Sequence, residues 1–199
     1  MRNKGMLIVI SGPTGAGKDE VIKELIKRNS DKLYLSVSLT TRAKKAGDIE
    51  GVNYNFISRQ EFFKKVEQGL FLEWGEVHEN YFGTLKHTVK RKLDEGINVV
   101  LSVDIKGALK VKEVYDDAIF IFVLPSSIDR LKERIKDKTE SPEALARKFN
   151  SAYAEINSIS KYNYGVVAKN IDEAVAKIEH IISAEECRVS RAKNYIKLD

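Results

Sequence analysis

Continuous apolar runs alternate with amphipathic segments along most of the chain, and this pattern predicts its elements. Buried strands are expected where β-branched and aromatic residues follow one another, at 6–10, 33–38, 97–103, 118–124 and 165–168. Apolar residues at helical spacing predict helices at about 20–27, 128–135, 142–160 and 174–182. Buried strands that alternate with helices are typical of a parallel sheet covered on both faces, so we expect an α/β fold.

The segment from 36 to 95 has a different pattern, which predicts a small β-rich insertion. Short strands are expected at 53–57, 70–74 and 81–84. Ser58-Arg59-Gln60-Glu61 is a capping box, which predicts a helix that ends near Gly69. A further helix at about 85–94 leads back to the core, which we expect to consist of residues 1–35 and 96–199.

Composition places the chain among globular proteins of one domain, with 199 residues of which 43% are hydrophobic and 32% charged. No apolar run approaches the roughly 20 residues that a membrane span needs. One cysteine, Cys187, excludes an intramolecular disulfide and fits a reducing cytoplasm. The net charge of +5 suits nucleic acid or a small polyphosphate, but the sequence has no nucleic-acid-binding motif. We therefore expect a cytoplasmic monomer or homodimer that acts on small molecules.

A glycine-rich turn joins the first strand to the first helix and predicts a phosphate-binding loop for ATP. Its residues are Gly12, Pro13, Thr14, Gly15, Ala16, Gly17, Lys18 and Asp19. The glycines let successive backbone N–H groups surround a phosphate, and the following helix adds its positive end. Lys18 is expected to reach the β- and γ-phosphates.

Asp19 stands where this motif has a Ser or Thr that ligates magnesium. A carboxylate is repelled by a neighbouring triphosphate, but magnesium between the two reverses the sign of the interaction. Asp19 therefore has two functional interpretations, a contact to Mg²⁺ or an impairment of nucleotide binding. A third interpretation is that it only stabilises the start of the helix.

Six separate stretches of the chain resemble sequence motifs of the guanylate kinase family. They are Ser36–Arg42, Gly51–Phe56, Phe71–Trp74, Asn80–Thr84, Val103–Gly107 and Ile121–Ser126. The first resembles the S-V-S-x-T-T-R loop for the nucleoside monophosphate, and Val103–Gly107 resembles the motif I-D-x-Q-G. Because the stretches cover nearly the whole chain, the resemblance is more specific than the glycine-rich loop alone.

The resemblance implies a P-loop kinase-type sheet, a GMP-binding region at about 36–95 and a helical lid at about 136–150. It implies transfer of the γ-phosphoryl group of ATP to GMP, with Mg²⁺ accompanying ATP. Ser38, Glu73, Thr84 and Asp104 would hydrogen-bond the guanine edge, Arg42, Lys45, Tyr54 and Tyr81 would hold the acceptor phosphate, and Phe82 would stack on the base. Lys18, Arg42, Arg134 and Arg147 would act in catalysis, and Lys138 would contact ATP. Arg134 and Arg147, with Lys138 and Lys148, would form a cationic lid over the transferring phosphate.

Several residues depart from the family's motifs and keep other functions open. Besides Asp19, these are Lys45, Ser102, Lys138 and Lys148, of which the three lysines stand where the family has arginines and Ser102 where it has an acid. One alternative is a catalytically impaired nucleotide-binding or scaffolding protein, and another is a related kinase with a different acceptor. Lys18 and Arg42 favour the enzyme, because phosphoryl transfer needs such cations to position and neutralise phosphates.

Overall fold

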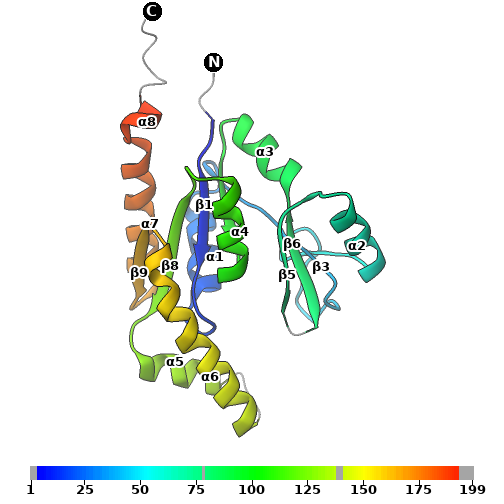
Figure 1. The fold of residues 1–199 in the computed structure, drawn as a ribbon. Coiled ribbons are helices and arrows are strands. Elements are labelled where there is room, and N and C mark those ends of the chain that lie inside the picture. Colours follow the sequence, from blue (N-terminus) through cyan, green and yellow to red (C-terminus); the bar gives the residue numbers. More distant parts are fainter. Residues whose placement is uncertain (1–3, 78, 138–140, 193–199) are drawn as a thin grey trace, which may run out of the picture.

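The central element of the computed structural model is a parallel sheet with helices on both faces (Figure 1). The model describes residues 4–77, 79–137 and 141–192. The sheet has the strand order β2-β7-β1-β8-β9, and all its pairs are parallel. Its strands are β1 (Leu7–Ser11), β2 (Leu33–Leu35), β7 (Asn98–Ser102), β8 (Ile119–Pro125) and β9 (Tyr164–Ala168).

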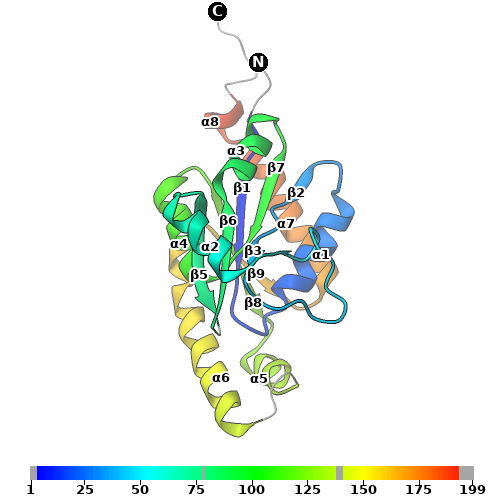
Figure 2. The same cartoon turned by 90° about the vertical axis from the view of Figure 1, so that its right-hand side faces the viewer.

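Successive residues of the central strands enter different layers of the core, because side chains alternate between the two faces of a sheet. Ile8 and Ile10 pack with α1 (Lys18–Arg28) and α7 (Ile171–Glu186). Leu7 and Val9 pack with α3 (Lys86–Asp94) and α4 (Ile105–Val114). The sheet is therefore buried on both sides, as Figure 2 also shows, and its ligand-binding edge is the one where the strands end.

A second, four-stranded sheet stands beside the parallel sheet (Figure 1). It consists of β3 (Leu39–Thr40), β4 (Asn55–Phe56), β5 (Phe71–Val77) and β6 (Asn80–Leu85), in the order β4-β3-β6-β5. One face is covered by α2 (Arg59–Glu67), whose Phe62 stacks on Phe71 with ring centroids 4.5 Å apart. The predicted capping box at Ser58 and Glu61 is confirmed.

Two helices beyond β8 form a small core of their own. They are α5 (Ile128–Lys136) and α6 (Pro142–Ile156), which pack through Leu131, Ile135 and Ala152. Ser127 and Ser141 cap these helices by accepting from backbone N–H groups in the first turns. A 3-10 helix, Asn157–Lys161, and α8, Val189–Ala192, complete the described elements. No helix within the described ranges is long and apolar enough to cross a membrane.

The predicted α/β fold is correct, but several expected elements have different bounds, and strand β3 and helix α4 were missed. The expected strand at 33–38 divides, because β2 ends at Leu35 and the chain crosses to the second sheet, where β3 begins at Leu39. The strand expected at 53–57 comprises Asn55–Phe56 alone. The helix expected to reach Ser160 ends at Ile156 and continues as the 3-10 helix. Helix α4 was not expected, although Asp104 is a typical N-cap.

Candidate active site

The glycine-rich turn lies at the carboxyl end of β1 and leads directly into α1. Gly17 is the N-cap of α1 with a φ of 89°, a left-handed conformation that side chains with a Cβ disfavour. Gly12 lies against β8, where an added Cβ would come within 2.5 Å of the Val123 carbonyl oxygen. The first N–H groups of a helix have no partner within the helix, so this turn can bind an anion.

Lys18 begins α1, and two side chains hold its ammonium group. Its Nζ donates to Ser102 Oγ at the end of β7, at 2.5 Å, and to Asp19 Oδ1, at 2.8 Å. The side chain of Lys18 is 18% exposed, whereas that of Asp19 is 85% exposed. The ammonium is therefore directed along the carboxyl edge of the sheet, with a solvated carboxylate beside it.

A buried carboxylate lies on the second sheet. Glu73 of β5 is 7% exposed, and its Oε1 accepts from the hydroxyl of its cross-strand partner Thr84 at 2.5 Å. Burial raises the pKa of Glu73 to about 7; the Thr84 hydrogen bond opposes this shift, and the negative charge of Asp104 adds to it. A buried acid with a perturbed pKa is a candidate for a functional role.

Asp104 follows β7 and lies close to Glu73. Its Oδ1 accepts from the backbone N–H of Gly107 at 2.7 Å and so caps α4, which packs against β5. The structure therefore brings together Glu73, Thr84 and Asp104, three of the four residues expected at the guanine edge. The fourth, Ser38, lies on the segment that joins the two sheets, where its carbonyl accepts from Asn55 N at 2.9 Å.

The loop after β3 is organised around one carboxylate. Asp48 Oδ2 accepts from the guanidinium of Arg42 at 2.9 Å and from the backbone N–H of Lys45 at 2.8 Å. The Lys45 backbone hydrogen bond is the largest cause of the lowered pKa of Asp48, and Arg42 lowers it further. The guanidinium also lies 5.3 Å from the ring centroid of Tyr54, while Lys45 is exposed.

Tyr54 links this loop to the glycine-rich turn. Burial raises the pKa of the Tyr54 hydroxyl, and the negative charge of Asp19 raises it further. Asp19 lies in the first turn of α1, beside the parallel sheet, whereas Tyr54 immediately precedes β4 of the second sheet. The charge of the glycine-rich turn therefore acts on Tyr54, whose ring also lies beside the Arg42 guanidinium.

The two aromatic residues of β6 lie on opposite faces of the second sheet. Phe82 packs against Tyr54 with ring centroids 5.5 Å apart, on the face that carries Glu73 and Thr84. Tyr81 packs 4.8 Å from Phe63, beneath α2. The ring of Tyr81 is therefore not brought to the expected phosphate site, because neighbouring residues of a strand point in opposite directions.

The expected lid residues are placed in part. Arg134 of α5 approaches the glycine-rich turn, with its NH1 3.5 Å from the Gly15 carbonyl oxygen. Arg147 is exposed on α6, Lys148 is half-buried on the same helix, and Lys138 lies outside the described residues. From the end of α6, the carboxylate of Glu155 accepts from Thr14 N at 3.3 Å. Two helices beyond β8 thus contact the turn directly.

Comparison with protein families decides which family this arrangement represents. The family model described as guanylate kinase matches residues 4–185. The chain belongs to the guanylate kinase family. A guanylate kinase of Clostridium perfringens (strain SM101) is 53% identical over 192 residues, which are 96% of this chain and 88% of that protein. A guanylate kinase of Caldanaerobacter subterraneus subsp. tengcongensis is 50% identical over 200 residues, covering 100% of this chain and 97% of that one.

The fold of this member of the guanylate kinase family also matches a solved structure. The crystal structure of guanylate kinase from Anaplasma phagocytophilum has a TM-score of 0.80 at 28% identity. The likeness covers 96% of this chain and 91% of that one. It confirms the predicted α/β architecture of a parallel sheet flanked by helices.

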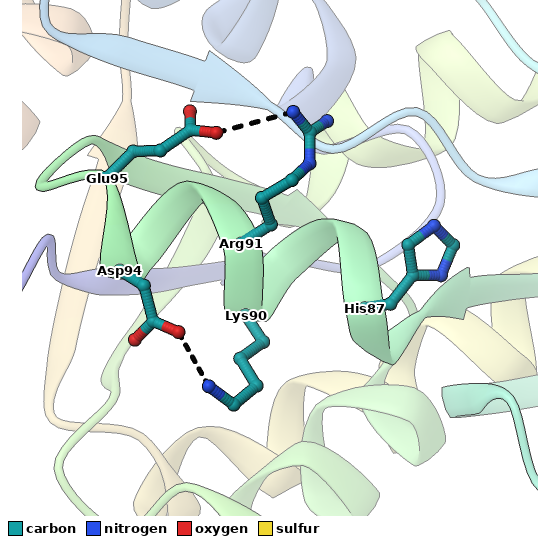
Figure 3. A pocket seen from close by; sticks show the side chains of 5 residues that line it. All are labelled: His87, Lys90, Arg91, Asp94 and Glu95. Carbon is teal, nitrogen blue, oxygen red and sulfur yellow. Dashed lines mark hydrogen bonds and ion pairs between the residues drawn. The ribbon is translucent and has the colours of Figure 1, made fainter.

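A pocket of about 430 Å³ lies along α3 (Figure 3). Its lining comes from α3 and the residue that follows it, namely His87, Lys90, Arg91, Asp94 and Glu95. The two ion pairs drawn there join residues one helical turn apart, Lys90 to Asp94 at 2.6 Å and Arg91 to Glu95 at 3.3 Å. Because this end of α3 contacts the amino end of β1 through Gly5, the pocket lies away from the phosphate-binding edge.

Sequence reasoning did not assign Asp48 or Glu155 to this family's site, and it gave Ser102 no partner. Asp48 stands within the basic loop, and its closeness in sequence to Arg42 and Lys45 could have indicated that it pairs with them. Ser102 and Lys18 are 84 positions apart in the sequence, and Glu155 and Thr14 are 141 apart. These contacts depend on the finished fold and leave no local pattern.

Proposed function

We propose that this protein transfers the γ-phosphoryl group of ATP to GMP and forms ADP and GDP. The observation that carries the proposal is the buried carboxylate of Glu73, which lies beside Asp104 at the start of α4. Burying a carboxylate is unfavourable unless it is paired, and Thr84 occupies one of its two oxygens. The relatives that are about half identical over nearly the whole chain are named guanylate kinase, which supports the same reaction.

Guanine is the base that suits this carboxylate. Its N1–H and exocyclic amine are neighbouring donors, which a carboxylate accepts, whereas adenine has an acceptor at N1 and no donor at C2. A buried acceptor left without its donor makes the wrong base unfavourable. In this proposal Glu73 accepts from the guanine edge, Thr84 orients Glu73, and Asp104 and Ser38 complete the base site. Phe82 stacks its ring on the base.

The acceptor phosphate belongs beside Arg42. Arg42 is paired with Asp48 and lies over the ring of Tyr54, so its guanidinium is already oriented. Lys45 adds a point charge without bidentate geometry. The hydroxyl of Tyr54 can donate to a phosphate oxygen, because a tyrosine is protonated at neutral pH. We place the GMP region at about 36–95.

ATP belongs on the glycine-rich turn from Gly12 to Asp19, with the lid at about 136–150 above it. Mg²⁺ is held by one or two carboxylates together with phosphate oxygens in such enzymes. Asp19 fits this requirement, because its carboxylate is 85% exposed at the anion-binding turn. When bound, the metal neutralises charge on the phosphate oxygens.

For this reaction the protein must position the two phosphates and supply positive charge, and it needs no general base. The attacking oxygen belongs to the phosphate of GMP, whose second ionisation lies near pH ~6, so it is deprotonated at neutral pH. Lys18 and Arg42 hold the two phosphates, and Arg134 approaches the same turn from α5. Arg147 adds charge from α6. Together they stabilise the negative charge of the transferring group.

These residues also weigh against an impaired binding or scaffolding protein. Lys18 keeps an oriented ammonium through Ser102, and Arg42 keeps an oriented guanidinium through Asp48. We place the reaction in the cytoplasm, where the one cysteine, Cys187, would stay reduced. ATP and GMP are the proposed partners.

The proposal is tested by ADP release from ATP with GMP, dGMP, AMP, UMP or no acceptor. We expect ADP with GMP at least about 100-fold faster than with AMP or without acceptor. Lys18→Met serves as the control, because it keeps the length of the side chain but removes the ammonium, and should lower the GMP-dependent rate strongly. Equal rates with GMP and without acceptor would contradict the proposal.

A further inference from the structure

Gly107 stands at a position where its own backbone does not need glycine. It lies in the first turn of α4 and is buried, and its φ is outside the left-handed region that favours glycine. Inside a helix, glycine is less favourable than alanine because it loses more conformational freedom on folding. The reason for glycine at this position must therefore lie in its neighbours.

The neighbour of Gly107 is the carboxylate that reads the base in the proposed function. A Cβ on Gly107 would lie 2.7 Å from Glu73 Oε2 and 3.3 Å from Glu73 Cδ. It would also lie 3.3 Å from Asp104 Oδ1, which accepts from the N–H of Gly107. A separation of 2.7 Å between carbon and a carboxylate oxygen is well inside normal contact distance, so one of the two would have to move.

Glu73 has little freedom to move away. Its Oε1 is fixed by the hydroxyl of Thr84 at 2.5 Å, and the residue is 7% exposed. Its Oε2 is the oxygen that would meet the added methyl group. Moving the carboxylate would break or bend the Thr84 hydrogen bond, or turn Oε2 away from its present direction.

We propose that Gly107 is a positioning residue for base recognition, because the missing side chain gives the Glu73 carboxylate its place. The inference rests on the proposed function, since it assigns Gly107 to the same guanine site. Gly107 does not touch the substrate in this account. It acts through Glu73, and the backbone of α4 forms the wall against which Oε2 lies.

The test is Gly107→Ala, measured by steady-state kinetics with GMP, AMP and ATP. We expect kcat/KM for GMP to fall about 10- to 100-fold, mainly through KM, because small displacements of a positioning group weaken oriented hydrogen bonds strongly. The KM for ATP should stay within about twofold, since the atoms nearest an added Cβ on Gly107 belong to Glu73 and Asp104 rather than to the glycine-rich turn. The ratio of kcat/KM for GMP to that for AMP should fall as well, because adenine offers Glu73 no donor.

Two further variants separate crowding from a general effect on folding. Gly165→Ala on β9 is the matched control, because its φ is also outside the left-handed region and its nearest atoms are the side-chain ends of Ile159 and Leu124. It should leave all kinetic constants unchanged. In a Glu73→Asp background, the acid is shorter by one methylene group and leaves room for a methyl group on residue 107. Adding Gly107→Ala to that background should change the kinetic constants less than twofold and should leave the urea midpoint of unfolding unchanged.

The outcomes distinguish this inference from the function on which it rests. Unchanged GMP kinetics in Gly107→Ala would overturn the inference, as would equal losses for GMP and ATP. If Gly107→Ala does not fold, folding of Glu73→Asp/Gly107→Ala supports the crowding argument, and its failure to fold overturns it. A wild-type protein that does not distinguish GMP from AMP would contradict the proposed function itself.

Discussion

Replacing Glu73 by glutamine separates the chemistry of the buried acid from its shape. Glu73→Gln keeps the size of the side chain, and the amide oxygen can still accept from Thr84. The other half of the group changes from an acceptor to a donor. In the proposed complex, this donor meets the N1–H and amine of guanine, which are donors too.

The stability effect of this change depends on pH. Burial raises the pKa of Glu73 from 4.5 to about 7, which corresponds to roughly 3 kcal/mol of unfavourable free energy for the ionised form. The folded protein therefore holds this proton more tightly than the unfolded chain. The stabilisation is fully present below pH ~4.5 and is lost as the pH rises through about 7. Glutamine removes this dependence, so Glu73→Gln should become more stable relative to wild type by up to about 3 kcal/mol between pH 5 and pH 8.

The activity effect has the opposite sign. Losing two hydrogen bonds to a charged acceptor and leaving donors unpaired corresponds to about 3 kcal/mol, so kcat/KM for GMP should fall by ~10²-fold or more. Wild-type kcat/KM for GMP should rise as the pH increases toward about 7 and then level off. The phosphate of GMP also ionises near pH ~6, but this ionisation is common to both proteins. The ratio of the two pH profiles therefore isolates Glu73.

Two measurements check these expectations on the same samples. Urea unfolding, followed by the fluorescence of the single tryptophan, Trp74, gives the free energy of unfolding at pH 5 and pH 8. Coupled ADP release gives kcat/KM for GMP across the same range. Equal GMP turnover in Glu73→Gln would refute the role of Glu73 in base recognition. A difference in unfolding free energy that does not change with pH would refute the argument from the buried charge.

Three further substitutions test the phosphate side of the site. Asp19→Ser should make ADP release at saturating GMP less dependent on magnesium without abolishing it; identical magnesium profiles and equal rates would mean that Asp19 does not contact the metal. Lys45→Arg should tighten GMP or leave its affinity unchanged in isothermal titration, because it keeps the charge and adds a bidentate fork; a large loss would show a different loop arrangement. Ser102→Ala removes the 2.5 Å hydrogen bond to Lys18, so kcat should fall several-fold, by about 1 kcal/mol, with the KM for GMP unchanged; an unchanged kcat would show that Asp19 alone orients Lys18.

The elements that the sequence predicts well are those whose burial determines their pattern. The strands around Ile8, Val100 and Ile121 are fully buried, so both faces must be apolar and the run is continuous. The prediction fails where tertiary structure redirects the chain. Ser36 N still bonds to Val100 O at 2.9 Å, but the next residues cross to the second sheet, and nothing in Ser36-Val37-Ser38 marks that departure.

The candidate site is predictable in residue type but not in arrangement. The family motifs indicated Glu73 and Asp104, and the structure brings them together. They also indicated Tyr81, although the alternation of side chains along a strand already places Tyr81 on the face opposite Thr84. They could not indicate why Gly107 is glycine, since the reason we propose is an oxygen of Glu73 on the second sheet.

The most direct test of the account is the acceptor preference of the wild-type protein. The measurement is kcat/KM in the ADP-release assay for GMP, inosine monophosphate and AMP at saturating ATP. Inosine monophosphate keeps N1–H but lacks the exocyclic amine, and AMP lacks both donors. We predict the order GMP, inosine monophosphate, AMP, with each lost donor lowering kcat/KM by about tenfold or more. Comparable values for GMP and AMP would contradict it, because adenine presents no donor at N1 or C2 to the buried carboxylate.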